Sequence, residues 1–241
     1  IRLVEMHRIL KPTGSLYLHC DPTASHYLKL VLDAVFGAER FINEVIWHRS
    51  GGFKRGTARN FPRKHDVLLV YARGESYTWR TQYRPHKPEY IARFKTDKHG
   101  RRYRDDVNPT AGGTRTIYLD DVPGDIVDSV WADIPPVNPQ AAERLGYPTQ
   151  KPLALLERII LASSNEGDVV LDPFCGCGTA IDAAQRLKRG WIGIDITHLA
   201  VALIRNRLGT SFPGLVYDVR GEPADAASAG ALAEAAPYQF Q

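Results

Sequence analysis

The fold is decided by one stretch, Val169-Val170-Leu171-Asp172-Pro173-Phe174-Cys175-Gly176-Cys177-Gly178-Thr179. Its first three apolar residues predict a short buried strand, which ends at Asp172 because Pro173 cannot continue it. Gly176 and Gly178 allow a tight turn and a close approach of the backbone to a ligand. A helix is expected from Thr179. A strand, a glycine-rich turn and a helix together form the usual ligand site of an open α/β sheet.

A second acid follows at the spacing that such a site requires. Asp195 closes an expected strand over 191–195 and lies 23 positions after Asp172. An acid about 20 residues after the glycine turn is where a pair of ribose hydroxyls is expected to bind. The chain has neither the Gly-Lys-Ser/Thr of a P-loop nor a GxGxxG sequence, so the spacing alone leaves plain turn chemistry as an alternative.

Two motifs resemble one enzyme family. The run Asp-Pro-Phe-x-Gly-x-Gly-Thr at 172–179 resembles the S-adenosylmethionine (SAM) motif of the DNA amino-methyltransferases, with Cys177 where the family usually has serine. Thr149-Gln150-Lys151-Pro152 precedes an expected helix over 153–162 and resembles the family's tenth motif, which packs beside the methionine end of the cofactor. The resemblance covers about residues 1–220.

This resemblance implies a set of cofactor-binding residues. Asp172 would hold the methionine amino group and Asp195 the ribose hydroxyls. A turn cap at Asp172, a helix N-cap at Asp195, core packing of Phe174 and a solvated Lys151 are the structural alternatives. The full predicted set is Asp172, Phe174, Gly176, Gly178, Thr179, Asp195 and Lys151.

The charge of the chain is concentrated in one segment. Residues 47–104 hold 16 Lys and Arg against four Asp and Glu, a local balance of +12 in a chain of net charge +4. The same segment holds 10 of the 23 aromatic residues. This combination favours nucleic acid as a partner over a solvated basic face, and the resemblance implies that the partner is double-stranded DNA. The predicted phosphate contacts are Arg49, Lys54, Arg55, Arg59, Arg63 and Lys64.

The periodicity predicts an α/β fold, and the resemblance implies a Rossmann-like methyltransferase sheet with circularly permuted motif order. Helices are expected over 1–10, 25–36 and 199–208, and strands over 15–20, 41–47, 65–71 and 215–219. The strands at 41–47 and 65–71 are expected to form an antiparallel pair. The expected division is a catalytic-side half (1–74), a target-recognition insert (75–134), a SAM-binding half (135–220) and an Ala-rich tail (221–241). The resemblance places this order in the β class, with a restriction subunit or a homodimer as further partners.

The family's catalytic motif, Asp/Asn/Ser-Pro-Pro-aromatic, does not occur in these 241 residues. Asp133-Ile134-Pro135-Pro136-Val137 has the wrong spacing, and Asp21-Pro22 is better explained as a helix cap. We therefore expect a fragment that lacks its catalytic strand and is inactive alone. The resemblance implies methylation of an exocyclic amine of a flipped base, with adenine N6 favoured over cytosine N4. The alternative is a catalytically incomplete module that binds DNA and SAM.

Composition excludes several other classes. No apolar run approaches the ~20 residues of a membrane span, and no secretory signal is visible. Three cysteines suggest a reducing compartment, so a cytoplasmic location is expected. Cys175 and Cys177 are too close for an ordinary disulfide or a C-x₂-C zinc site, and no metal is predicted.

Overall fold

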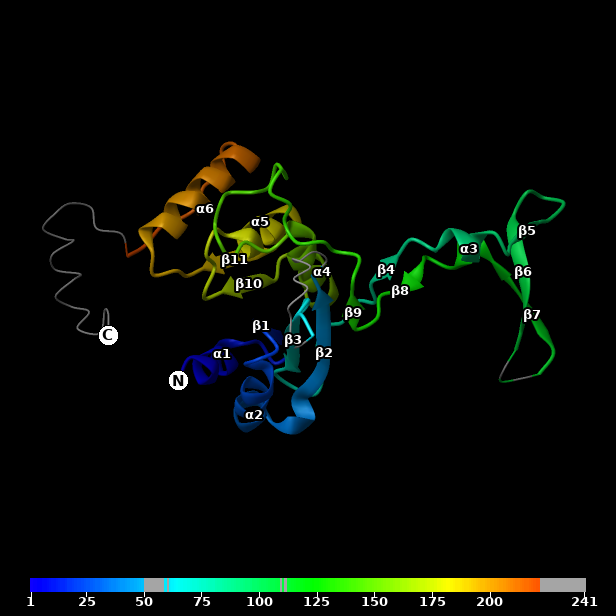
Figure 1. Cartoon of the computed structure of the whole chain (residues 1–241), viewed down its shortest axis with the longest axis horizontal. Helices are drawn as coiled ribbons and strands as arrows, with labels where there is room; N and C mark the ends of the chain where they lie inside the picture. The colour runs from blue at the N-terminus through cyan, green and yellow to red at the C-terminus, as the bar shows by residue number, and fades with distance from the viewer. Residues whose placement is uncertain (50–58, 60, 109, 111, 222–241) are drawn as a thin grey trace, which may run out of the picture.

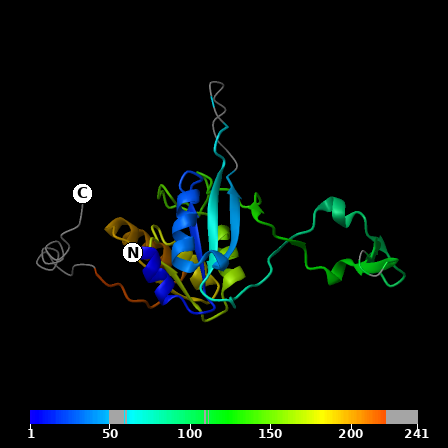
Figure 2. The ribbon, with the colours of Figure 1, turned by 90° about the horizontal axis from the view of Figure 1, so that it is seen from below.

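The computed structural model describes residues 1–49, 59, 61–108, 110 and 112–221. These residues form a body of two packed α/β units and a long arm that extends from one side of it (Figure 1). In the perpendicular view the arm again leaves the body on the side away from the N-terminus (Figure 2). Among the described residues, no helix is both long enough and apolar enough to span a bilayer.

The first unit is a four-stranded sheet in the order β1-β3-β2-β9. Its central strand β3 (His65–Ala72) pairs antiparallel with β1 (Ser15–Cys20) and with β2 (Phe41–His48), and β9 (Val130–Trp131) runs parallel to β2. The antiparallel pairing predicted for 41–47 and 65–71 is confirmed.

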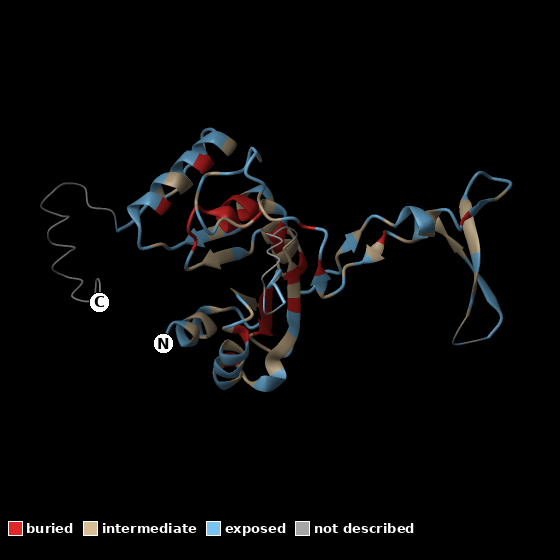
Figure 3. Ribbon diagram, in the orientation of Figure 1, coloured by how far each residue is buried: buried red, intermediate tan, exposed pale blue. Residues whose placement is uncertain are grey.

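Both faces of β3 are buried, which explains its continuous apolar sequence. Val67, Leu69 and Tyr71 pack on one face with the helix α2 (Ser25–Phe36), beside α1 (Arg2–Ile9) and the short 3₁₀ turn Ala38–Arg40. Leu68 and Val70 point to the other face and contact the helix α4 (Leu153–Ser163). The buried residues are concentrated in β3 and in the helix α5 (Figure 3).

The second unit is a strand–helix–strand arrangement. The strand β10 (Val169–Asp172) leads through the glycine turn into α5 (Thr179–Arg186), and β11 (Gly190–Gly193) returns parallel to β10. Ala183 and Ala184 pack against α4, while α6 (His198–Ser211) covers the other side. The predicted helices at 153–162 and 199–208 are confirmed.

The two units do not form the single sheet that the sequence predicted. Within the described residues, β1 pairs only with β3 and β10 only with β11. Side chains and loops join the units instead: the Tyr17 hydroxyl lies 2.6 Å from Ser163 Oγ, and Lys11 Nζ lies 2.9 Å from Asp168 Oδ1.

The strand predicted at 215–219 is also wrong. The described residues there offer no neighbouring strand, so Leu215 and Tyr217 pack on the core while Val216 is exposed.

The arm contains short strands with little core. Two of them, β4 (Tyr83–Arg84) and β8 (Asp125–Ile126), pair near the body, and α3 (Pro88–Ile91) follows β4. Its far end is the sheet of β5 (Lys95–Thr96), β6 (Arg102–Val107) and β7 (Thr114–Tyr118), followed by a 3₁₀ turn at Leu119–Asp121. The domain boundaries stay a prediction, although β9 lies inside the predicted insert and pairs with the body.

Candidate functional site: a carboxylate-flanked turn beside a basic cavity

The ends of β10 and β11 are joined by backbone hydrogen bonds. Ile194 N donates to the carbonyl of Asp172 (2.9 Å), and Cys175 N donates to the carbonyl of Ile194 (3.0 Å). The Asp172 side chain accepts from Phe174 N through Oδ1 (3.1 Å). Burial raises the pKa of Asp172, the hydrogen bond from Phe174 lowers it, and the nearby Asp195 raises it further. The turn therefore begins at a carboxylate that its surroundings disfavour in the charged form.

Asp195 closes the turn from the neighbouring strand. Its Oδ2 accepts from Gly176 N at 2.9 Å, and its Oδ1 accepts from Thr197 N and Thr197 Oγ1 at 2.9 and 2.8 Å. The N-cap of α6 is Thr197, which accepts from Ala200 N, so the N-cap alternative for Asp195 is wrong. Because β10 and β11 run parallel, Asp172 and Asp195 lie at the same edge of this sheet.

At both glycines of the turn, other side chains of the protein occupy the space that a Cβ atom would take. Gly176 has φ +49° and Gly178 has φ +75°, both in the left-handed region. A Cβ at Gly176 would lie 2.9 Å from the Tyr147 ring, and one at Gly178 would lie 2.7 Å from Ile204. The turn is thus packed from two sides by side chains distant in sequence.

The other predicted turn residues differ in exposure. Phe174 is 57% exposed, with the Arg2 guanidinium 5.3 Å from its ring centroid, so core packing of Phe174 is excluded. Thr179 is buried as the first residue of α5, and its hydroxyl lies 3.8 Å from Cys177 Sγ. Cofactor contacts by either residue stay predictions.

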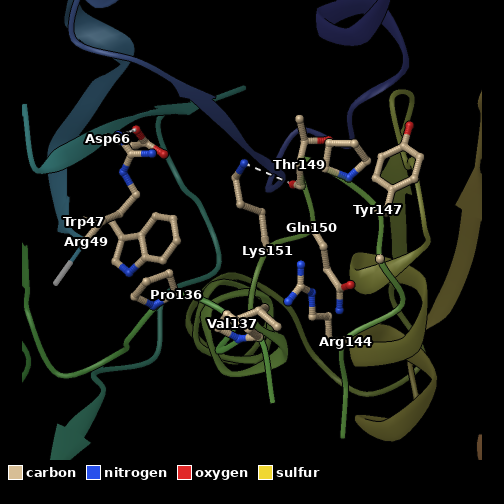
Figure 4. A pocket seen from close by; sticks show the side chains of 13 residues that line it. Trp47, Arg49, Asp66, Pro136, Val137, Arg144, Tyr147, Thr149, Gln150 and Lys151 are labelled. Carbon is tan, nitrogen blue, oxygen red and sulfur yellow. Dashed lines mark hydrogen bonds and ion pairs between the residues drawn. The ribbon is translucent and has the colours of Figure 1, made fainter. Parts of the chain in front are cut away.

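A cavity of about 300 Å³ lies beside the turn, between the ends of β2 and β3 and the loop 136–151 (Figure 4). Lys151 points into it, donates to the Thr149 carbonyl at 3.3 Å, and has its pKa lowered by burial. Asp66 lies in its wall and binds Arg49 Nη2 (3.1 Å) and His19 Nε2 (2.9 Å). Burial also lowers the pKa of His19, so at neutral pH the imidazole is neutral and donates to Asp66.

The predicted phosphate contacts do not gather at one place. Arg49 faces the cavity, whereas Arg63 donates to Thr23 Oγ1 at 2.6 Å. Arg59 and Lys64 are exposed, and Lys54 and Arg55 lie outside the described residues.

Sequence reasoning missed three residues of this region: Tyr147, Asp66 and Trp47. Trp47 and Asp66 sit where β2 ends and β3 begins, so the predicted antiparallel pairing was a signal that they meet. Nothing in the sequence pattern predicted the contact of Tyr147 with Gly176, because Tyr147 lies in a loop and pairs with no strand. Among the described residues, no group of three or more His, Cys, Asp and Glu side chains is arranged to hold a metal ion.

Comparison with known proteins agrees with this geometry. The sequence model of one family, described as DNA methylase, matches residues 2–206. The chain is 30% identical to the type II methyltransferase M.EcaI of Enterobacter cloacae over 86% of its length, and 30% identical to the DNA adenine methyltransferase YhdJ of Escherichia coli (strain K12), again over 86%. It covers 55% of M.EcaI and 64% of YhdJ, less than two thirds of either relative.

A solved structure shares the fold. The M1.HpyAVI–SAM complex superposes with a TM-score of 0.54 at 22% identity, over 86% of this chain and 79% of that one. The α/β fold with mixed sheets is therefore that of DNA methyltransferases. Since the family match spans more than half of the residues, the chain belongs to the DNA methylase family.

Proposed function

We propose that the protein transfers a methyl group from SAM to an exocyclic amine of a base in double-stranded DNA, with adenine N6 favoured. The observation that supports this most is the pair of carboxylates, Asp172 and Asp195, at the ends of two neighbouring parallel strands in a DNA methylase chain. The relative YhdJ is a DNA adenine methyltransferase, and M1.HpyAVI was solved with SAM.

The side chains of the turn fit SAM chemically. Asp172 uses Oδ1 for Phe174 N, and its Oδ2 has no hydrogen-bond partner among the described residues. A half-buried carboxylate without an ion-pair partner suits an ammonium group such as that of methionine. Asp195 Oδ2 accepts one hydrogen bond and has capacity for a hydroxyl donor. The exposed ring of Phe174 offers an apolar surface beside them.

The residues of this chain would bind and orient rather than react. SAM supplies a methyl group on a positively charged sulfur. Asp172 would hold the amino-acid end, Asp195 the ribose, and Phe174 would exclude water from one side. The buried turn at 176–179 fixes the positions of these groups, which favours an oriented transfer.

A second candidate function is a module that binds SAM and DNA without transfer. An exocyclic amine needs an acceptor for its hydrogens, because its lone pair is delocalised into the base. The carboxylate next to the only Pro-Pro pair, Asp133, is instead held by two hydrogen bonds from Arg158, at 3.0 and 2.5 Å. Asp21 accepts from Thr23 N and Ala24 N before α2. Arg158 therefore engages both oxygens of Asp133, and Asp21 uses Oδ1 to cap the turn before α2.

Two assays separate these candidates. Calorimetric titration with SAM should give one site per chain, weakened at least tenfold in Asp172→Asn and unchanged in the exposed control Asp218→Asn. Labelled methyl groups from SAM are then followed into duplex DNA, and the modified base is identified after hydrolysis. N6-methyladenine in the DNA supports the enzyme; binding of both ligands without transfer supports the module; absence of SAM binding refutes both.

The proposal extends to partners. Duplex DNA would contact the basic residues of segment 49–64, and a restriction subunit or a second copy of the chain would assemble with the body. Light scattering of the chain alone and with duplex DNA measures the assembly directly. A single chain under both conditions would refute the homodimer.

A further inference from the structure

The helix α6 contacts both halves of the carboxylate-flanked turn. Its N-cap Thr197 donates to Asp195 Oδ1 through its backbone N and its hydroxyl, at 2.9 and 2.8 Å. Further along the helix, Ile204 occupies the space beside Gly178, where a Cβ would lie 2.7 Å from the Ile204 Cγ1 atom. Leu208 is fully buried in the same apolar cluster as Ile204. One helix therefore connects the acid that follows β11 to the glycine turn that follows β10.

A buried ion pair lies within this contact. Arg207 of α6 and Asp182 of α5 expose only 6% and 5% of their surface, and Arg207 Nη1 lies 3.6 Å from Asp182 Oδ2. The other oxygen of Asp182, Oδ1, accepts from Arg186 Nε at 2.7 Å. Arg207 Nη2 donates to Cys177 Sγ in the turn at 3.9 Å. The Arg207 guanidinium thus joins α5, α6 and the turn at one buried point.

Stability alone does not explain a charge at position 207. Two charges removed from water recover only part of their desolvation free energy, and apolar side chains of similar volume often stabilise a fold equally well. A guanidinium, however, has donors in a rigid planar fork. One Nη group of Arg207 is bound by α5 and the other by the turn, so the fork sets the position of the turn relative to the two helices.

We propose that Arg207 is a positioning residue for SAM, which holds the glycine turn and the acid after β11 at the separation that the cofactor needs. The inference rests on the proposed function, in which Asp172 and Asp195 bind different parts of one ligand. Binding at two points is tightest where the points are already fixed, because no free energy is then spent on ordering them. Since its side chain is buried, Arg207 acts on the cofactor through the turn.

The test compares SAM affinity among variants of Arg207 and Cys177 by calorimetric titration. Arg207→Met should bind SAM about five- to tenfold more weakly, within the range for residues that influence a site without contacting its ligand. Arg207→Lys should recover part of this loss, because an ammonium keeps the charge beside Asp182 but lacks the planar fork. Cys177→Ala removes the acceptor in the turn and should weaken binding, whereas Cys177→Ser keeps an acceptor and should match wild type.

Two further variants separate positioning from general destabilisation. Leu32→Ala removes a fully buried side chain of α2, in the other unit, and should lower the thermal unfolding midpoint as Arg207→Met does. At a temperature well below both midpoints, Leu32→Ala should bind SAM like wild type. Asp182→Asn combined with Arg207→Met removes both buried charges, so it should unfold at a higher temperature than Arg207→Met alone and still bind SAM as weakly.

Each outcome supports or overturns the positioning role. Weaker SAM binding in Arg207→Met and in the double variant, but not in Leu32→Ala, supports it. Equal affinity in wild type and Arg207→Met overturns it, and the proposed function then still stands if Asp172→Asn binds SAM weakly. An equal loss in Leu32→Ala also overturns it, because affinity then follows stability. If the wild-type chain binds no SAM, the proposed function and the positioning role are both refuted.

Discussion

The hydrogen bonds of Asp195 predict a specific difference between two substitutions. In Asp195→Ala the buried Gly176 N–H loses its only side-chain acceptor, at 2.9 Å in the structure. An unpaired buried donor costs about 1–3 kcal/mol. Thr197 is exposed, so water replaces its two lost bonds at little cost. In Asp195→Asn the amide oxygen can serve Gly176 while its NH₂ group donates to the Thr197 hydroxyl. We therefore expect a loss below about 1 kcal/mol for Asp195→Asn.

Urea unfolding followed by circular dichroism measures this difference, and thermal unfolding supports it. For a chain of this size each kcal/mol lowers the melting temperature by about 2–4 °C. Asp195→Ala should thus melt about 2–12 °C below wild type, whereas the exposed control Asp218→Asn should match wild type within about 0.5 kcal/mol. Equal stabilities of the Ala and Asn variants would show that the bond to Gly176 does not stabilise the turn.

Three further substitutions test the surroundings of the site. Gly178→Ala should cost about 2–5 kcal/mol in urea unfolding, from left-handed strain and contact with Ile204, whereas Gly167→Ala, with φ +81° and open space, should cost only about 1–2 kcal/mol. Burial raises the pKa of Asp172 in the folded protein, so this carboxyl lowers the stability of the fold as the pH rises above about 3.9, the pKa of an unfolded Asp. Asp172→Asn removes the carboxyl and should therefore stabilise the protein at pH 7. Thermal melts should show that this gain vanishes below about pH 3.9. Asp133→Asn should behave oppositely, because Arg158 lowers the pKa of Asp133: the variant should be less stable above about pH 3.9, and the difference should close in melts at lower pH.

Much of the local structure follows from sequence. The apolar runs at 15–20, 41–48 and 65–72 form strands because one or both faces are buried, and β-branched residues suit that environment. The helix at 25–36 was predicted to its ends, since Asp21 caps the preceding turn and Gly37 adopts φ +94°. The carboxylates of the turn were identifiable because strand ends of a parallel pair meet at one edge.

Long-range packing was not predictable in the same way. The glycine pattern suggested space for a ligand, but Tyr147 and Ile204 fill the positions that a Cβ would take. The cavity is lined by Trp47, Asp66 and Lys151, among other residues. These positions are far apart in the sequence, so helical or strand periodicity could not predict that they meet. The expected strand at 215–219 failed because an apolar alternation forms a strand only where a neighbour completes its hydrogen bonds.

The charge pattern around Tyr147 gives the strongest link between fold and function. The Tyr147 ring packs on Gly176 in the turn that Asp172 and Asp195 flank, and within the described residues neither carboxylate forms an ion pair. Tyr147 also lines the cavity together with Lys151 and Arg144, and neither of these cations forms an ion pair within the described residues. A partly buried charge without a partner costs free energy, so stability alone does not account for these side chains. In the proposed function, the unpaired carboxylates of the turn suit the cationic end of SAM.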